Sequence, residues 1–343
     1  MRYLSILCLL CAAAGAGAET APGSIPIIYT TDLYHPHQDP DDHFDLATLF
    51  ALPEFDIRAI VIDVGERGKG RPGIVPLKQM MYLTGRDVPF AAGLLGNLTG
   101  PEDTAADQPA ESQAGVELIL KALRESSEPV VVFVTGSLRD VAAAYNRDPE
   151  LFKKQVRRLY INAGHADGGA EYNVELDPVA YIRMLTAPLP VFWVPCFGKD
   201  GFESLWNFTQ ADVLDGAPEP LQQFFVYALN RTDPKDLDPI AALTMPVIDT
   251  EKGKYWADIR NMWCTAALLH AAGRETGPYA FPQEWVLVGP RGQTELTDPD
   301  RGVRIRVFYH EAPFAYRAAM RATLQGLFAT MPLKVQTAET SPE

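Results

Sequence analysis

The chain has 343 residues, of which 47% are hydrophobic and 22% charged, a balance typical of a folded globular protein and not of a disordered, collagen-like or coiled-coil chain. It has 44 Asp and Glu against 30 Lys and Arg, a formal net charge of −14. This acidic excess argues against nucleic acid or an anionic membrane as a partner, because both bind clustered basic side chains.

Residues 1–18 have the pattern of a secretory signal peptide. Arg2 supplies a positive start, residues 4–14 form an apolar run too short to span a bilayer, and small residues at 16–18 fit a cleavage site. We therefore expect an exported protein, periplasmic or secreted, that begins at Glu19. Loss of Arg2 changes the charge to 29 − 44 = −15.

Strand-like and helix-like segments alternate in the remaining sequence, which predicts βαβ units and an open, mostly parallel sheet flanked by helices, a Rossmann-like α/β fold. In chain order, we expect a strand at residues 25–29, a helix at 44–51, a strand at 57–64, a helix at 74–83, a strand at 88–91, a surface loop at 96–113, a helix at 113–125, a strand at 129–135, a helix at 137–145, a strand at 156–161, a helix at 178–185, a strand at 191–195, helices at 221–229, 240–243 and 259–272, strands at 285–288 and 303–308, and a helix at 315–328. The length fits one domain, expected over residues 19–335, with a flexible tail at 336–343.

An acidic, histidine-rich segment follows directly after the first expected strand. It contains four Asp and three His: Asp32, Asp39, Asp41, Asp42, His35, His37 and His43. Ligands of open α/β sheets bind at the carboxyl ends of strands, so this is a candidate site. Carboxylates this close together stay ionised only if they are solvated or gathered around a cation; otherwise they hold protons.

Several interpretations of this segment compete. It could be a solvated acidic loop, or a site for Ca²⁺, which prefers oxygen donors. His35, His37 and Asp39 have the spacing of a metallo-β-lactamase zinc motif, although Pro40 stands where the next His would be. The run that starts at Asp41 also fits the DDxxD motif of terpenoid synthases, but those enzymes are all-helical and this chain alternates strands with helices.

Four blocks in a consistent order resemble the nucleoside hydrolase family of the inosine/uridine-preferring type. They are residues 27–32 with the later Asp41-Asp42 pair, the turn at 134–140 (VTGSLRD, against TGPLTN), residues 170–178 (AEYNVELDP, against AEFNxxxDP), and residues 236–239 (DLDP, against an HDP element before a late helix). The ending after Gly292-Gln293-Thr294 also fits. The resemblance extends over nearly the whole mature chain, and AEYNxxxDP is its most specific part.

This resemblance implies a Ca²⁺-dependent hydrolase that cleaves the N-glycosidic bond of nucleosides or of a related ribosyl compound. The implied metal ligands are Asp32, Asp42, Asp238 and the backbone carbonyl of Thr135. Asp32 would also act as the general base on the attacking water.

The implied substrate-binding residues are Asp41, Glu171 and Asn173, which would hold ribose hydroxyls, together with Glu66 and Asp238. Cleavage of such a bond passes through an oxocarbenium-like state, which nearby carboxylates stabilise. The implied partner is thus a small nucleoside or ribosyl molecule. Because members of the family often form dimers or tetramers, the resemblance is also consistent with a homo-oligomer.

The sequence also departs from the family pattern. Eight residues instead of three separate Asp32 from Asp41, Glu66 takes a position usually held by Asn, and Leu237 replaces a His that assists the leaving base in many members. We therefore expect Ca²⁺ and diol binding with an altered substrate. Since Leu cannot donate a proton, His35 or His37 is our candidate for the leaving-group acid, with His43 and Tyr34 as further possibilities.

Two other functions remain open at this point. One is a catalytically silent protein that binds Ca²⁺ and a sugar or nucleoside on the same scaffold; the other is a zinc hydrolase that uses His35, His37 and Asp39. Outside the signal segment the chain has two cysteines, Cys196 and Cys264, which we expect to be separate buried thiols and not a disulfide scaffold.

Overall fold

The computed structural model describes residues 23–274 and 276–334. The expected signal peptide and tail lie outside these residues. The strands are β1 (Ile25–Thr31), β2 (Phe55–Ile62), β3 (Phe90–Ala92), β4 (Val130–Val134), β5 (Val156–Ile161), β6 (Val191–Trp193), β7 (Trp206–Thr209), β8 (Ile259–Met262), β9 (Tyr279–Ala280), β10 (Gln283–Val288), β11 (Thr294–Leu296), β12 (Val303–Val307) and β13 (Tyr309–His310).

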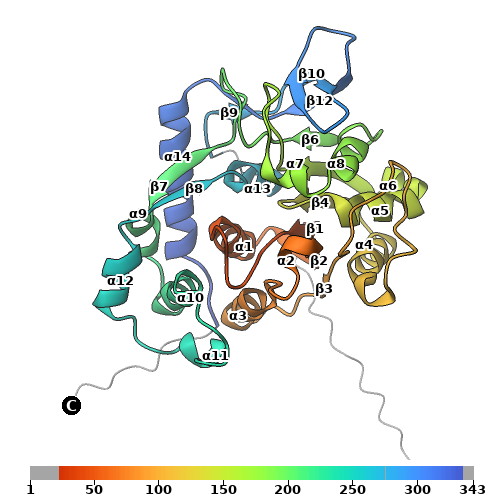
Figure 1. Cartoon of the computed structure of the whole chain (residues 1–343). Coiled ribbons are helices and arrows are strands. Elements are labelled where there is room, and N and C mark those ends of the chain that lie inside the picture. Colours follow the sequence, from red (N-terminus) through yellow and green to blue (C-terminus); the bar gives the residue numbers. More distant parts are fainter. Residues whose placement is uncertain (1–22, 275, 335–343) are drawn as a thin grey trace, which may run out of the picture.

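The helices follow the same order along the chain (Figure 1). They are α1 (Asp41–Ala51), α2 (Gly65–Gly68), α3 (Ile74–Thr84), α4 (Ala114–Glu125), α5 (Arg139–Arg147), α6 (Pro149–Gln155), α7 (Tyr172–Leu176), α8 (Pro178–Leu185), α9 (Gln210–Leu214), α10 (Glu219–Leu229), α11 (Pro239–Ala242), α12 (Asp249–Tyr255), α13 (Thr265–Ala271) and α14 (Pro313–Ala329), with a short 3₁₀ turn η1 (Ala110–Ser112).

Nine of these strands form one sheet in the order β11-β10-β12-β6-β5-β4-β1-β2-β3, whereas β9 pairs with β13 and β7 with β8. Neighbours from β12 through to β3 pair in parallel, and only β10 runs antiparallel to its two neighbours. The predicted fold class, an open and mostly parallel sheet flanked by helices, is therefore confirmed. None of the helices within residues 23–274 and 276–334 is long and apolar enough to cross a membrane.

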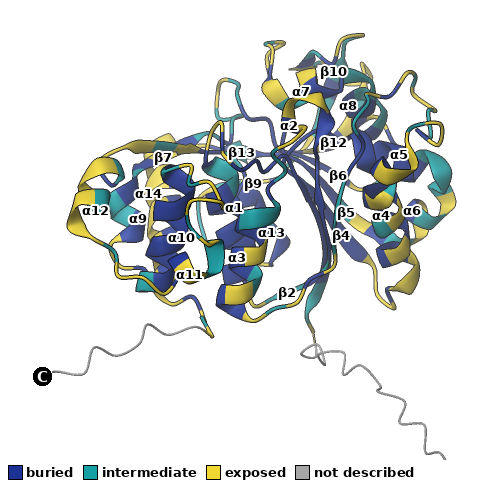
Figure 2. Ribbon diagram, turned by 60° about the horizontal axis from the view of Figure 1, so that its bottom comes forward, coloured by how far each residue is buried: buried dark blue, intermediate teal, exposed yellow. Residues whose placement is uncertain are grey.

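The sheet separates two hydrophobic cores, one on each face (Figure 2). Alternate residues of β4 serve the two cores: Val131 and Phe133 pack on the side of α1, α10, α13 and α14, whereas Val132 and Val134 pack on the side of α4, α5 and α8. Side chains of a strand alternate between faces, so a strand covered on both faces has to be apolar throughout. This explains the unbroken apolar run of β4.

The chain changes direction across the sheet at β1. From there β2 and β3 extend to one side, and β4, β5 and β6 to the other, so β1 and β4 lie side by side. Helices that leave two such strands cover opposite faces, which opens a crevice at their carboxyl ends. Asp32 directly follows β1 and Thr135 directly follows β4, so both lie at this crevice.

One expected helix is divided in the structure. Residues 259–272 were expected to be helical throughout, but the first four form β8, which pairs antiparallel with β7, and the helix α13 begins only at Thr265. Pairing with β7, which lies some 50 positions earlier in the chain, is a tertiary contact that overrides the local apolar pattern. As a result, Trp263 and Cys264 lie in the connection between β8 and α13.

Candidate active site

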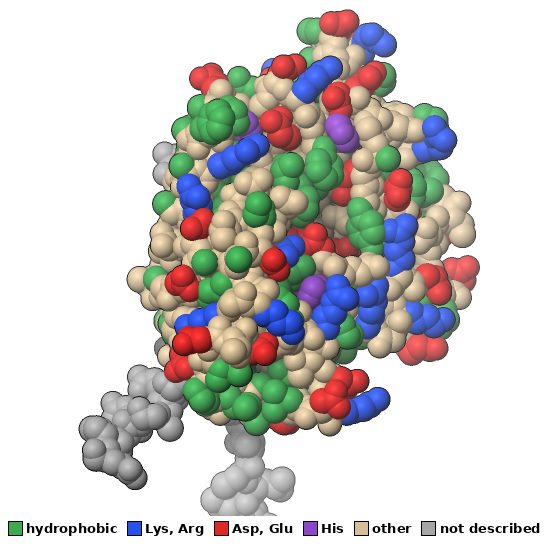
Figure 3. All heavy atoms as spheres, turned by 60° about the vertical axis from the view of Figure 1, so that its left-hand side comes forward, with side chains coloured by type: hydrophobic (Ala, Val, Ile, Leu, Met, Phe, Trp, Pro, Cys, Tyr) green, Lys and Arg blue, Asp and Glu red, His purple; other side chains and the backbone are tan. Residues whose placement is uncertain are grey.

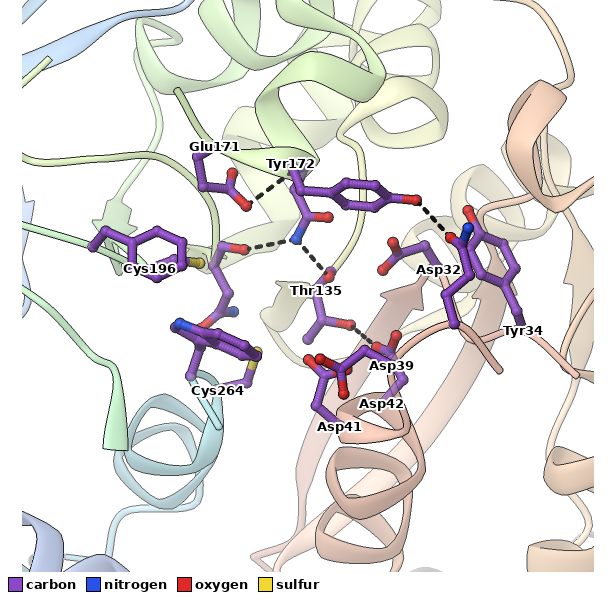
Figure 4. A pocket seen from close by; sticks show the side chains of 15 residues that line it. Asp32, Tyr34, Asp39, Asp41, Asp42, Thr135, Glu171, Tyr172, Cys196 and Cys264 are labelled. Carbon is purple, nitrogen blue, oxygen red and sulfur yellow. Dashed lines mark hydrogen bonds between the residues drawn. The ribbon is translucent and has the colours of Figure 1, made fainter. Parts of the chain in front are cut away.

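A pocket of about 420 Å³ opens where the carboxyl ends of β1 and β4 meet. Its lining is Asp32, Tyr34, Gln38, Asp39, Asp41, Asp42, Thr135, Asn162, Glu171, Tyr172, Asn173, Cys196, Phe197, Trp263 and Cys264 (Figure 4). A space-filling view of one face shows a hollow with acidic side chains inside it and basic side chains beside it (Figure 3). Six residues predicted for the site therefore meet in one pocket: Asp32, Asp41, Asp42, Thr135, Glu171 and Asn173.

The acidic wall is built by the end of β1 and the first turn of α1. Asp41 and Asp42 begin this helix, where the positive end of the helix dipole favours negative charge. The hydroxyl of Thr31 donates to Asp42 Oδ1 at 2.8 Å, and the hydroxyl of Thr135 lies 3.5 Å from the same oxygen. Asp42 is thereby fixed between β1 and β4.

The carboxyl groups of this wall oppose each other's ionisation. Burial raises the pKa of Asp32 well above its ordinary value, and the neighbouring Asp42, Asp63 and Asp41 add to the shift. Burial and the charge of Asp45 raise the pKa of Asp42 to about 8, against the lowering effect of the Thr31 hydrogen bond. Without a positive charge in the pocket, these groups would hold protons at neutral pH.

Glu171 and Asn173 form the opposite wall and belong to the AEYN motif. The carboxylate of Glu171 caps α7 by accepting hydrogen bonds from the backbone N–H groups of Asn173 and Val174, and it also accepts from Gly164 N at 2.8 Å. The amide of Asn173 donates to the carbonyl oxygen of Thr135 at 3.0 Å. Glu171 therefore has a structural role as a helix cap, which the sequence analysis did not recognise.

A buried ion-pair network holds the motifs in place behind the pocket. Arg139, from the 134–140 turn, donates to Asp63 at 3.0 Å and to Asp177 at 3.3 Å. Asp63 follows β2 and also accepts from Ser137 N at 2.7 Å, whereas Asp177 caps α8. One guanidinium thus joins the ends of three separate segments, and the Asp-Pro of the AEYNxxxDP motif is part of this support.

The longer loop between β1 and α1 reaches across the mouth of the pocket. The hydroxyl of Tyr172 donates to Gln38 Oε1 at 3.1 Å, and Asp39 forms an ion pair with Arg260 of β8 (Figure 4 shows the Tyr172 contact). The extra residues therefore connect α7 with strand β8 over the acidic wall.

A third wall consists of two cysteine–aromatic pairs. Cys196 and Phe197 follow β6, and Trp263 and Cys264 precede α13. The rings of Phe197 and Trp263 meet edge to face with their centroids 5.9 Å apart. Both cysteines are free and buried, as expected, but they line the same pocket.

This arrangement can be compared with known proteins. The sequence profile described as inosine-uridine preferring nucleoside hydrolase matches residues 27–263, more than half of the chain. The chain belongs to this nucleoside hydrolase family. The resemblance inferred from the four sequence blocks is therefore confirmed.

Curated relatives of this nucleoside hydrolase family include two bacterial proteins named pyrimidine-specific ribonucleoside hydrolase RihA. The one from Escherichia coli O127:H6 is 31% identical over 189 residues, and the one from Citrobacter koseri is 29% identical over 189 residues. Each alignment covers 49% of this chain and 59% of the relative. The match thus spans less than two thirds of these relatives.

Solved nucleoside hydrolases share the fold over most of their length. The plant nucleoside hydrolase PpNRh1 superposes with a TM-score of 0.61 at 19% identity, covering 90% of this chain and all of that one. The inosine-uridine preferring nucleoside hydrolase from Bacillus anthracis gives a TM-score of 0.53 at 14% identity, covering 88% of this chain and 99% of that one. At these identities the likeness speaks for the fold alone.

The structure corrects one site assigned through the nucleoside hydrolase pattern. Asp238 does not line the pocket; its exposed carboxylate caps α11 by accepting from Ile240 N and Ala241 N. The late helix whose start lies at the pocket is α13, and the residues just before it, Trp263 and Cys264, line the pocket. Sequence reasoning missed both, because residues 259–272 were read as one continuous helix.

The histidines of the inserted loop also lie elsewhere than expected. His35 Nε2 donates to the carbonyl of Thr232 at 2.8 Å and its ring stacks on Tyr227, whereas His37 packs edge to face against His43. None of the three belongs to the pocket lining. The hypothesis that His35 or His37 protonates the leaving group therefore has no geometric support.

The zinc alternative has no geometric support either. Asp39 forms an ion pair with Arg260, so its carboxylate is already engaged by a cationic side chain. No group of three or more His, Cys, Asp or Glu side chains is arranged to hold a metal ion in the part of the chain that the structure describes.

Glu66 lies in a neighbouring pocket of about 320 Å³ that shares only Tyr34 with the first. Its exposed carboxylate stands near Lys69, with 3.9 Å between Oε2 and Nζ. The structure thus places Glu66 beside the acidic pocket and not among its walls.

Proposed function

We propose that this protein is a hydrolase of the N-glycosidic bond in ribonucleosides or related ribosyl compounds. The observation that carries the proposal is the meeting of Asp32, Asp41, Asp42, Thr135, Glu171 and Asn173 in one pocket at the switch point of the sheet. Family membership supports the reaction class, and the names of the RihA relatives indicate ribonucleosides as substrates of those proteins.

The ribose would lie between the two polar walls. Asp41, on the first turn of α1, and Asn173, on α7, present carboxylate and amide groups from opposite sides of the pocket. Such groups accept from and donate to sugar hydroxyls, and carboxylates also stabilise the positive charge that develops on the ring. This pairing would orient the sugar while the bond to the base breaks.

Asp32 would remove a proton from the attacking water. It lies at the carboxyl end of β1 with only 6% of its surface exposed, and the other pocket acids surround it. It can accept that proton only when it is ionised, a state that a cation beside it would favour. Its place on the strand end also fixes its direction, since β1 is paired on both sides.

The donors in this part of the pocket are two carboxylates and a backbone carbonyl, the oxygen type that Ca²⁺ prefers, and we propose Ca²⁺ as the cation. Asp32 and Asp42 offer carboxylates, and the Thr135 carbonyl keeps a lone pair beyond the one used by Asn173. A bound cation would offset the mutual repulsion that raises the pKa of both acids. When bound, Ca²⁺ would hold the sugar diol and lower the pKa of a water.

The leaving base would face the aromatic wall. Phe197 and Trp263 offer apolar surface to a planar ring, and the indole N–H of Trp263 has no hydrogen-bond partner among the described residues. That N–H can donate a hydrogen bond to the base but cannot transfer a proton at neutral pH. We therefore expect substrates whose base leaves without full protonation by the protein.

A panel of purine and pyrimidine nucleosides, assayed for released reducing sugar, tests the proposal. Metal analysis of the purified protein and recovery with Ca²⁺ after chelation test the cation. Release of ribose from at least one nucleoside, restored by Ca²⁺ and not by Zn²⁺, is the expected result. Stoichiometric Zn²⁺ in the active protein would contradict the Ca²⁺ assignment.

One observation favours a silent binding protein as a second candidate. The pocket is lined by acids, amides, aromatics and thiols but by none of the described histidines. A protein of this kind would bind ribose or a nucleoside in the presence of Ca²⁺ without cleaving any member of the panel. Calorimetric titration with ribose, next to the sugar-release assay, separates the two candidates.

A further inference from the structure

Two cysteines of the pocket belong to segments that approach each other from different parts of the fold. Cys196 follows β6, and its backbone N–H donates to the carbonyl of Gly164 at 2.9 Å. Cys264 precedes α13, and its carbonyl accepts from Leu268 N at 3.0 Å. Both side chains are 5% exposed and line the same pocket. They are therefore buried in the protein but face a space that small molecules can enter.

The neighbouring residues show how close these two segments lie. Phe197 directly follows Cys196 and Trp263 directly precedes Cys264, and the two rings are in contact with centroids 5.9 Å apart. The close-up shows both thiols on the side of the pocket away from Asp32 and Tyr34 (Figure 4). Burial raises the pKa of both thiols well above the ordinary value, with Glu171 adding to the effect on Cys196 and Asp45 and Cys196 adding to the effect on Cys264.

We propose that Cys196 and Cys264 form an oxidation site that closes into a disulfide across the pocket wall. The co-reactant is a low-molecular-weight disulfide. Because burial raises the pKa of both thiols, the attacking thiolate forms at alkaline pH. It attacks a sulfur of this reagent, forming a mixed disulfide and releasing one thiolate of the reagent. The second cysteine then displaces the remaining reagent thiolate, and the two protons lost by the protein are taken up by the two released thiolates. The protein is oxidised by two electrons, and the reagent is reduced to two thiols.

Disulfide formation would change the pocket locally. It would join the segment after β6 to the start of α13 and thus fix the positions of Phe197 and Trp263, the surface proposed to face the base. It would also remove the thiol of Cys264 from its hydrogen bond with the buried carboxyl of Asp45, a bond that lowers the pKa of Asp45 against the larger effect of burial. A buried acceptor that loses its donor destabilises the state in which this happens. We therefore expect a disulfide that thiols reduce readily.

Peptide mapping of the full chain tests the proposal without any assay of turnover. The protein is kept in a chelator, so that no metal masks the thiols, and incubated at alkaline pH with oxidised or with reduced glutathione before alkylation with N-ethylmaleimide at neutral pH. The expected result is a linked pair of peptides containing Cys196 and Cys264 after oxidation, and two alkylated peptides after addition of dithiothreitol. Mapping by peptide keeps Cys8 and Cys11 out of the count.

Single variants give matched controls. In Cys196→Ser, we expect no linked peptides and a glutathione adduct on Cys264, and in Cys264→Ser the reverse. Wild-type protein that shows two separately alkylated peptides after oxidation, or an adduct on each cysteine without a link, would overturn the proposal. Because this readout needs no nucleoside, its failure is distinguishable from failure of the proposed hydrolase activity.

The effect on the pocket needs a second comparison. The affinity for ribose is measured by calorimetry for oxidised and reduced protein, with the double variant Cys196→Ser/Cys264→Ser treated in parallel. In wild type, we expect the oxidised and the reduced protein to differ several-fold in their affinity for ribose. In the double variant, we expect the two treatments to give the same affinity. Equal affinities of oxidised and reduced wild type would show that the disulfide leaves the pocket unaffected and would overturn this part of the proposal.

Discussion

The side-chain amide of Asn173 donates a hydrogen bond to the backbone carbonyl oxygen of Thr135 over 3.0 Å. This contact joins the AEYN motif on α7 to the turn after β4, two segments 38 positions apart. A carbonyl oxygen has two lone pairs, so one can serve Asn173 while the other faces the pocket. The proposed sugar-binding amide thus also orients a proposed cation ligand.

Replacing Asn173 by Ala should therefore weaken both sugar and cation binding. We expect kcat/KM for the best nucleoside to fall on the order of 10- to 100-fold, as for the loss of one or two hydrogen bonds in a buried site. Asn146 is a matched control, because its amide also donates to backbone carbonyls, those of Pro101 and Asp103, but lies outside the pocket. Equal kinetics of Asn173→Ala and Asn146→Ala would contradict the role of Asn173.

Asp32→Asn removes the proposed base while conserving size and shape. We expect kcat to fall on the order of 10²- to 10⁴-fold, the usual contribution of a general base, whereas ribose still binds because the other polar residues of the pocket remain. Rapid-quench kinetics and calorimetry measure the two quantities separately. Turnover at the wild-type rate would exclude Asp32 as the base.

Asp238→Ala tests the correction made by the structure. The variant loses the cap of α11, which should lower the free energy of unfolding by about 1 kcal/mol in urea titrations. Turnover and Ca²⁺ content should not change, because the carboxylate is exposed and lies outside the pocket lining. Loss of Ca²⁺ from this variant would restore Asp238 as a ligand.

His35→Ala and His37→Ala should retain turnover within a few-fold of wild type. The two rings contact Tyr227 and His43, and not the pocket. The variants and wild type are compared by measuring kcat across a pH series. If a histidine were the leaving-group acid, kcat of wild type would change with pH around the pKa of that histidine. An acidic limb that disappears in either variant would revive the original hypothesis.

The raised pKa of the buried Asp140 carboxyl makes the stability of the protein depend on pH. Burial, with the charge of Asp63 adding to it, raises the pKa of Asp140 to about 7, against the lowering effect of the hydrogen bond from Leu94 N. Between about pH 4 and this value the folded chain keeps the proton that the unfolded chain releases, so the free energy of unfolding falls as pH rises. The total loss over this range is on the order of 4 kcal/mol.

Asp140→Asn should remove this part of the pH dependence, because the amide stays neutral and can still accept from Leu94 N. Urea titrations at about pH 5 and about pH 8 would then show a smaller difference in unfolding free energy for the variant than for wild type. The same slope in both proteins would show that Asp140 is not the group responsible.

Much of the fold could be predicted from sequence because its signals are local. The unbroken apolar run of β4 marks a strand buried on both faces, and the confirmed parallel sheet follows from the alternation of such runs with helices. Asp32, Asp41 and Asp42 were found because acids directly after a strand lie at the binding edge of an α/β sheet. The AEYN motif located Glu171 and Asn173, although not the capping role of Glu171.

What only the tertiary structure decided is which late helix reaches the pocket. The sequence shows a helix start at Asp238-Pro239, and this start is real, since Asp238 caps α11. But α11 packs against α3 and α10, whereas α13 packs against α1, which bears Asp41 and Asp42. The sequence around Trp263 and Cys264 does not show that these residues lie at the pocket. The reason is that the pairing of β8 with β7 determines where α13 begins. Local patterns specify where helices and strands form, but only packing between distant segments places their ends around one pocket.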